Sequence, residues 1–139
     1  MDAIDSKIIT LLQKNARLSI VDISKEVCLS RPSVKERINK LVEQKIIQEF
    51  TIMVDQEKMG KPISYFIEVS QLMIPTKKFE TILTTFPDII EIHTITGTAN
   101  YIVKGASKST NEMNVLLSEL IKYAKVNTSL ILNSTYSIA

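Results

Sequence analysis

Residues 31–45 concentrate side chains whose chemistry suits a nucleic acid. This stretch holds a surplus of three positive charges, whereas residues 51–139 balance eight Lys against eight acidic residues. The basic residues of the stretch are Arg31, Lys35, Arg37, Lys40 and Lys45, and its acidic residues are Glu36 and Glu43. The whole chain carries only +2, so the basic surplus is local. A local surplus of this kind predicts a nucleic-acid contact at one end of the chain.

The spacing within the stretch separates two kinds of candidate contact. If Val34 marks the buried side of a helix, the residues on or beside the outward side are Pro32, Ser33, Lys35, Glu36, Asn39 and Lys40. In the major groove, Lys reads guanine and Asn reads adenine, so this side predicts base contacts. The residues better placed for phosphates are Arg31, Arg37, Lys40 and Lys45. The alternative interpretation is a charged helix side that faces only solvent.

Three short amphipathic helices are predicted to position these side chains. Apolar residues recur at helical spacing in the first of them, over residues 3–15. Ser19 and Ser30 have the spacing of N-caps, which predicts a second helix over residues 20–27 and a third from Ser30 onward. Only residues 28–30 separate the second helix from the third. Two short helices joined by such a short connection are typical of a helix-turn-helix.

The remaining sequence changes to patterns typical of strands. Phe50, Ile52 and Val54 alternate with other residues and predict a strand before a connector. The later strands and helices are predicted at residues 63–71, 76–85, 89–96, 101–106, 109–123 and about 128–138. Their β-α-β-β-α-β order is that of a ferredoxin-like domain. The predicted fold class is α+β, with a winged helix-turn-helix at 1–50, a linker at 51–62 and a ferredoxin-like domain at 63–139.

Such a domain leaves one face of its sheet uncovered, because both helices pack on the other face. We expect this free face to carry enough apolar side chains to favour a partner, most simply a second copy of the chain. A homodimer would also present two helix-turn-helix units to double-stranded DNA.

The residues resemble those of the Lrp/AsnC family, the feast/famine regulators of bacteria and archaea. The resemblance covers nearly the whole chain and rests on the order and spacing of several short segments. They are Ile4-Asp5-Ser6-Lys7-Ile8-Ile9, Asn15-Ala16-Arg17-Leu18-Ser19, Leu29-Ser30, Val34, Arg37-Ile38, Leu41, residues 46–51 and Asp55 to Gly60. The resemblance implies a sequence-specific regulator of transcription, in which a winged-helix DNA reader is joined to an amino-acid-sensing domain that forms dimers and often octamers.

The family's Gly-x-x-Asp-Tyr turn falls at Gly97, Thr98, Ala99, Asn100 and Tyr101. The resemblance implies that these residues bind a small effector, whereas the residues alone are equally those of a plain hairpin turn. Two positions depart from the family. Cys28 stands where the family usually has Gly, and Asn100 replaces the Asp that could pair with an effector's ammonium group.

Other chemistry has little support in the sequence. His93 is the single histidine and has only Glu91 nearby on the same strand face, so we expect a structural or interface role and no metal. Cys28 has no partner for a disulfide and is expected to be a small buried hydrophobe in a reducing cytoplasm. The acidic N-terminus and the charges that interrupt every apolar stretch predict neither a signal peptide nor a membrane span.

Catalysis is not expected, and neither is a cofactor. The sequence has no paired nucleophile and base, no carboxylate cluster and no glycine-rich phosphate loop. Residues 51–139 contain no Arg that could hold a phosphate. The alternative to a specific regulator is an architectural chromatin protein that uses the same fold with little sequence selectivity and no effector.

Overall fold

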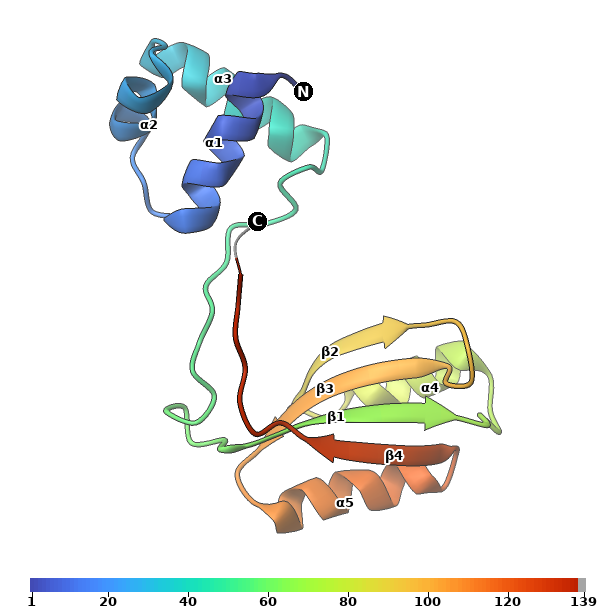
Figure 1. The fold of residues 1–139 in the computed structure, drawn as a ribbon. Coiled ribbons are helices and arrows are strands. Elements are labelled where there is room, and N and C mark those ends of the chain that lie inside the picture. The colour runs from blue at the N-terminus through green and yellow to red at the C-terminus, as the bar shows by residue number, and fades with distance from the viewer. Residues whose placement is uncertain (138–139) are drawn as a thin grey trace. The chain divides into compact units, whose positions relative to one another are not determined.

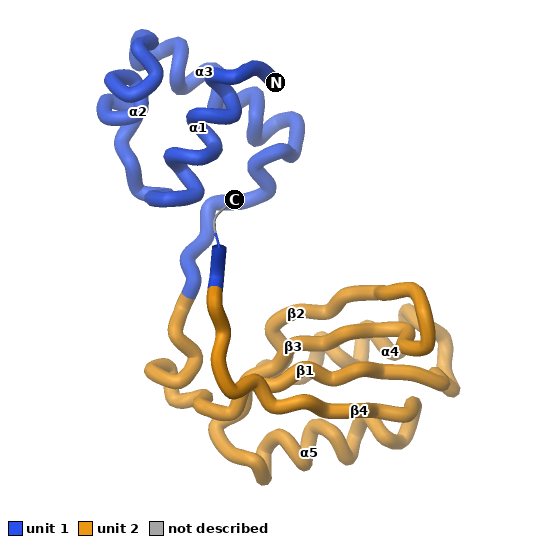
Figure 2. The backbone as a smooth tube through the Cα atoms, in the orientation of Figure 1, with its two compact units in different colours: residues 1–53, 136–139 blue, residues 54–135 orange. Residues whose placement is uncertain are grey.

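The structure is a computed structural model that describes residues 1–137 (Figure 1). The chain divides into two compact units, of which one holds residues 1–53 with Tyr136 and Ser137, and the other holds residues 54–135 (Figure 2). None of the helices in the described residues is both long and apolar enough to cross a membrane. Each unit has its own hydrophobic core.

Unit 1 consists of three helices, α1 (Ala3–Lys14), α2 (Ile20–Val27) and α3 (Arg31–Glu43). Their bounds confirm the three predicted helices and the short α2–α3 connection. The buried side chains that join the helices are Ile8, Ile23, Val27, Val34 and Leu41. Val34 is fully buried, so the side of α3 opposite it faces outward, as the spacing predicts.

Both predicted N-caps are present. The hydroxyl of Ser19 accepts a hydrogen bond from the amide of Asp22 at 3.1 Å, and the hydroxyl of Ser30 accepts one from Ser33 at 3.3 Å. Each bond satisfies an amide that has no partner within its helix. The start of α3, the helix with the candidate base contacts, is therefore fixed by local sequence.

The turn between α2 and α3 holds an unfavourable backbone conformation. Cys28 ends α2 with φ 55° and ψ 43°, in the left-handed region, where a residue with a Cβ atom loses about 1 kcal/mol. Glycine avoids this cost, which explains why it is the common residue in such turns. The prediction that Cys28 is buried is wrong: its side chain is exposed, because the left-handed turn directs it away from the core of unit 1.

The predicted strand at Phe50, Ile52 and Val54 is not formed in the single chain. All three side chains are exposed, and the segment pairs with no strand among the described residues. An alternating pattern specifies a strand only where another strand satisfies its backbone groups. The wing that this strand would contribute is therefore absent from residues 1–137 of the isolated chain.

Unit 2 confirms the predicted β-α-β-β-α-β order. Its elements are β1 (Ile63–Ser70), α4 (Thr76–Thr84), β2 (Ile89–Thr94), β3 (Tyr101–Ser107), α5 (Thr110–Ile121) and β4 (Lys125–Leu130). The antiparallel strands lie in the order β2-β3-β1-β4, and α4 and α5 cover the same face of the sheet (Figure 1). This arrangement is the ferredoxin-like fold.

The final strand begins and ends earlier than predicted. The expected range was about 128–138, whereas β4 runs from Lys125 to Leu130. Most residues of β4 are polar, so the local sequence shows little apolar alternation there. The place of β4 is set by its pairing with β1, where Val126 lies opposite Val69. The predicted end at Ile138 lies outside the described residues.

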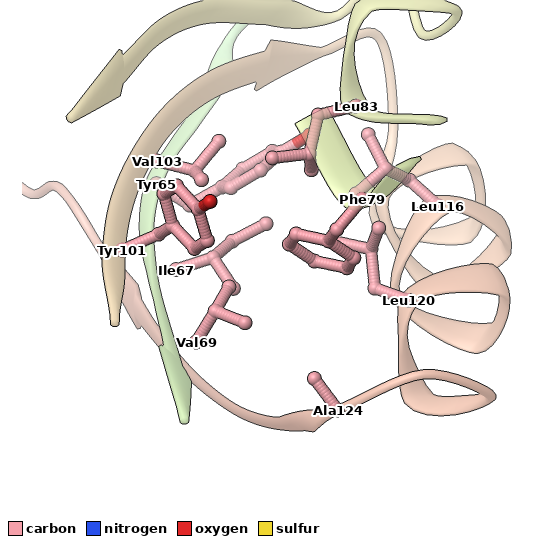
Figure 3. Packing of buried hydrophobic residues seen from close by; sticks show 10 residues of the cluster. All are labelled: Tyr65, Ile67, Val69, Phe79, Leu83, Tyr101, Val103, Leu116, Leu120 and Ala124. Atoms are coloured by element: carbon pink, nitrogen blue, oxygen red, sulfur yellow. The ribbon is translucent and has the colours of Figure 1, made fainter. Parts of the chain in front are cut away.

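The core of unit 2 lies between the sheet and the two helices (Figure 3). Its largest buried side chains include Tyr65, Phe79 and Tyr101. Tyr65 lies opposite Gly105 on the neighbouring strand, and a Cβ atom on Gly105 would stand 2.6 Å from Cε2 of the Tyr65 ring. A glycine at this position is therefore required by the close approach of the ring.

A chain of polar groups connects the buried Tyr65 to the surface. Ser107 donates its hydroxyl hydrogen to Asp88 at 2.7 Å, so the Tyr65 hydroxyl donates to Ser107 at 2.8 Å. Lys61 pairs with the same Asp88 at 2.9 Å. Burial alone would raise the pKa of Asp88, but hydrogen bonds from Lys61 and Ser107 outweigh it and lower the pKa. The chain ties Lys61, just before β1, to the sheet.

The uncovered face of the sheet carries both apolar and charged side chains. The strand register and burial pattern place on this face Phe66, Glu68, Glu91, His93, Ile102, Lys104, Asn127 and Ser129. Phe66 and Ile102 are its only large apolar side chains in that set. Glu68, Glu91 and Lys104 occupy outward positions that alternate with core residues, and the association of two copies through this face stays a prediction.

Candidate nucleic-acid interface and effector turn

The outward side of α3 gathers most of the predicted DNA contacts. The exposed residues are Arg31, Pro32, Lys35, Glu36, Asn39 and Lys40, while Ser33 is half-buried. A helix with short polar and long basic side chains on one side has the form that enters the major groove. The structure thus brings the candidate base contacts together on one surface.

The basic side chains on α3 differ in how they are neutralised. Lys40 pairs with Glu36 at 3.1 Å, one turn apart on the same helix, and both side chains are well exposed. Such a pair is weak and exchanges readily with solvent or another anion. Within residues 1–137, Arg31 and Lys35 form no ion pair, so both can contact DNA without first leaving a carboxylate.

Arg37 occupies a different place from the other basic residues. Its Nη1 atom lies 2.8 Å from a carboxylate oxygen of Asp2 and 2.8 Å from one of Asp5, and its side chain is 28% exposed. These contacts join α3 to the start of α1. Backbone hydrogen bonds first, and then Arg37, hold the pKa of both carboxyl groups below the usual range. The two aspartates therefore remain ionised at neutral pH.

The flank of α3 next to these aspartates is hollowed. A cavity of about 340 Å³ is lined by residues of α1 and α3, among them Asp5, Ser33, Glu36, Arg37 and Lys40. Arg37 therefore borders the same hollow as the exposed Glu36 and Lys40.

Sequence reasoning missed the residues of α1 that hold α3 and α2 in place. The sequence predictions assign no contact to Asp2 or Asp5, although their i, i+3 spacing is that of a capping box. The ammonium group of Lys7 donates a hydrogen bond to the backbone carbonyl of Glu26, near the end of α2. The capping spacing was a usable signal for Asp2 and Asp5, whereas nothing in the local sequence indicates the partner of Lys7.

The candidate effector turn connects β2 to β3. Gly97 has φ 111°, a conformation that a residue with a side chain rarely adopts, so the turn requires glycine there. The amide of Asn100 donates to the carbonyl of Val69, and its carbonyl accepts from Ile95 at 3.0 Å. Both bonds hold the end of the turn against the sheet.

The tip of the turn presents free donors. Within the described residues, the amides of Gly97, Thr98 and Ala99 donate to no acceptor. Gly97, Thr98 and Asn100 are exposed and Ala99 is half-buried. Three neighbouring amides beside an exposed Asn side chain can donate hydrogen bonds to an anionic group of a ligand.

Tyr101, the fifth residue of the predicted turn site, is separate from its exposed surface. Its ring is 1% exposed and packs on the helix side of the sheet, where it contacts Phe79 with 5.7 Å between the ring centroids (Figure 3). Its hydroxyl donates to Glu80 of α4 at 2.9 Å. Burial first, and then this bond, raise the pKa of the phenol. Tyr101 therefore anchors the turn rather than presenting its ring at the tip.

His93 and Glu91 meet on the uncovered sheet face. The Nε2 atom of His93 lies 3.0 Å from Glu91, and Lys104 lies 3.7 Å from the other oxygen of the same carboxylate. The hydrogen bond with His93 is the main cause that lowers the pKa of Glu91. No group of three or more potential metal ligands occurs among the described residues.

Two family models match the chain in the order of its two units. The AsnC-type helix-turn-helix domain matches residues 1–42, and the Lrp/AsnC ligand binding domain matches residues 64–137. The HTH-type transcriptional regulator LrpC of Bacillus subtilis is 33% identical over 131 residues, which is 94% of this chain and 91% of LrpC. The HTH-type transcriptional regulator FL11 of Pyrococcus horikoshii is 33% identical over 117 residues, which is 84% of this chain and 78% of FL11.

Solved structures show the same fold. LrpC of Bacillus subtilis matches with a TM-score of 0.93 and 31% identity over 99% of each chain. A transcriptional regulator of Neisseria meningitidis, solved as a complex with L-Met, matches with a TM-score of 0.89 and 21% identity, covering 99% of this chain and 93% of its own.

A helix-turn-helix domain followed by a ligand-binding α+β domain defines a DNA-binding transcriptional regulator. One family model covers more than half of this chain. Two relatives are 33% identical to it over most of its length. The chain belongs to the Lrp/AsnC family of HTH-type transcriptional regulators.

Proposed function

We propose that the protein recognises specific operator sequences by inserting the outward side of α3 into the major groove. The observation that carries this proposal is the exposed set of polar and basic side chains opposite the buried Val34. Lys35 and Asn39 read bases, Arg31 and Lys40 bind phosphates, and Pro32, Ser33 and Glu36 lie beside them. Because operators lie in genomic DNA and its relatives are bacterial and archaeal, the protein works in the cytoplasm. It acts by binding and not as an enzyme.

The experiment that tests this function compares a selected duplex with a random one at a stated salt concentration. A specific regulator should bind its preferred sequence at least about a thousandfold more tightly than random DNA at physiological salt. An architectural chromatin protein should bind both within about tenfold, because phosphates provide most of its affinity. Selection from a random library followed by fluorescence anisotropy measures the ratio, and equal affinities would leave only the architectural role.

We also propose that two copies associate through the uncovered sheet face. The face offers Phe66 and Ile102 for apolar contact, and it carries both acidic and basic groups that a second copy can complement, such as Glu68 and Lys104. A two-fold pair would present two α3 helices to successive major grooves, about 34–36 Å apart or a multiple of that distance. Larger assemblies, such as octamers, would be built from this pair.

Sedimentation at micromolar concentration tests the dimer. The parent should sediment as a dimer or a multiple of one, and Phe66→Glu should shift it toward the monomer because a buried charge at the contact is costly. Val115→Glu is the matched control, since Val115 is 66% exposed on α5 and lies off the uncovered face. A monomeric parent, or equal effects of the two variants, would contradict this interface.

The third part of the proposed function is an effector site at the β2–β3 turn. The amides of Gly97, Thr98 and Ala99 are suited to a carboxylate, and Asn100 offers its amide oxygen to an ammonium group. A free amino acid carries both groups. The match to the ligand binding domain of the family supports this assignment.

A further inference from the structure

Arg37 closes a ring of hydrogen bonds that joins α3 to the N-terminus of α1. The amide of Asp5 donates to Oδ1 of Asp2 at 2.9 Å, and the amide of Asp2 donates to Oδ2 of Asp5 at 3.0 Å. The remaining oxygen of each carboxylate accepts from Nη1 of Arg37 at 2.8 Å. One carboxylate oxygen of each aspartate therefore caps α1, and the other binds α3.

This ring restrains α3 in two respects. Arg37 lies near the middle of α3, so its two bonds limit both sliding along the helix axis and rotation about it. Asp5 is 14% exposed and is itself held by the capping bonds, so it is a fixed point for Arg37. Arg37 also lies one turn after Ser33 and two residues before Asn39, close to the outward side that would meet the bases.

The ring also removes Arg37 from the charges available to DNA. Its guanidinium is shared by two carboxylates, whereas a phosphate contact requires a donor that is free or weakly paired. Lys40, by comparison, pairs with a single carboxylate and is 64% exposed. If Arg37 bound a phosphate, the two aspartates beside it would repel that phosphate and oppose DNA binding.

We infer that Arg37 is a positioning residue that sets the register of α3 against α1, and that it does not contact the DNA backbone. The inference rests on the proposed binding of DNA through α3. It assigns Asp2 and Asp5 to the same task, although neither lies on the outward side of α3.

The two possible roles of Arg37 predict opposite effects of removing the carboxylates. Asp2→Asn with Asp5→Asn keeps side-chain oxygens that can cap α1 but removes both charges that hold Arg37. For a positioning residue, this variant should bind the preferred operator about tenfold more weakly, as if one base contact were lost, with random DNA little changed. For a phosphate contact, removing the two neighbouring negative charges should tighten binding to both duplexes alike.

Matched controls isolate the ring from the change in net charge. Glu26→Gln with Glu49→Gln removes two exposed carboxylates of unit 1 that form no ion pair among the described residues. Arg37→Gln should lower the operator-to-random ratio about as much as the double aspartate variant without reducing the salt slope. The variant that combines these three substitutions should lower the operator-to-random ratio no further than either does, because all three changes break the same ring of hydrogen bonds.

All variants are measured at a temperature where melting curves show them folded, so that loss of stability alone cannot change the ratio. If the double variant does not fold, Asp2→Asn, at the more exposed of the two aspartates, replaces it with a smaller expected loss in the ratio. Tighter binding by either aspartate variant relative to its control, or a salt slope lowered by about 0.9 in Arg37→Gln, would overturn the inference. A parent that shows no operator preference would instead refute the proposed function.

Discussion

Replacing Lys35 and Asn39 together by alanine should lower the affinity for the preferred operator by roughly thirtyfold or more. Each good side-chain contact with a base edge contributes about 1–3 kcal/mol of discrimination, so two contacts contribute at least about 2 kcal/mol. Both residues are exposed on the outward side of α3 and take no part in the core of unit 1. The change should therefore leave the melting temperature of the protein nearly unchanged.

Single variants on α3 should differ in the salt dependence of their binding, which is measured at several salt concentrations. Asn39→Ala removes no charge, so it should reduce the preference between sequences without changing the salt slope. Arg31→Ala and Lys40→Ala should each weaken preferred and random duplexes alike and reduce the slope by about 0.9. Lys78→Ala is the matched control, because it removes an exposed positive charge from α4 in unit 2. If Asn39→Ala and Lys35→Ala keep the full operator preference, α3 is not the reader.

The elements of the fold that could be predicted are those that local sequence specifies. Ser19 and Ser30 fix helix starts within three residues of themselves, and the spacing of apolar residues gives the helices of unit 1 and most strands of unit 2. The candidate base contacts of α3 followed from the same periodicity, because Val34 is buried as expected.

The elements that were missed depend on groups distant in sequence. Arg37 finds its aspartates 35 and 32 residues away, and a basic residue on a helix gives no local sign of an internal partner. Phe50 to Val54 has a strand pattern but no strand to pair with in the single chain. The range of β4 is set by its pairing with β1. In each case a tertiary partner, not the local pattern, decides the outcome.

The candidate effector turn lies between these two cases. Its position followed from the sequence, but which of its residues are exposed and which are buried did not. Gly97 and Asn100 are exposed at the tip, whereas the ring of Tyr101 is buried and anchors the turn through Glu80. The alternation along β3 places Tyr101 on the helix side together with Val103. A shared motif therefore does not imply that all of its residues touch a ligand.

Asn100→Asp should strengthen the binding of a free amino acid by about two- to thirtyfold. A neutral hydrogen bond contributes about 1 kcal/mol and a charge-assisted one about 1.5–3 kcal/mol, so a carboxylate at this position should bind an ammonium group better than the Asn oxygen does. The backbone of Asn100 is held by Val69 and Ile95 in either variant. The substitution changes the charge of the exposed side chain and leaves the turn in place.

Thermal melting in the presence of each common amino acid measures this effect. A ligand at a hundred times its dissociation constant should add about 2.7 kcal/mol to the free energy of unfolding, which is readily visible as a higher melting temperature. Asn114→Asp in α5 provides the matched control, because it adds the same charge to unit 2 away from the turn. We expect weak stabilisation of the parent and stronger stabilisation of Asn100→Asp by the same amino acid. If no amino acid at millimolar concentration stabilises either protein, the turn is a plain hairpin and unit 2 serves only to join two copies.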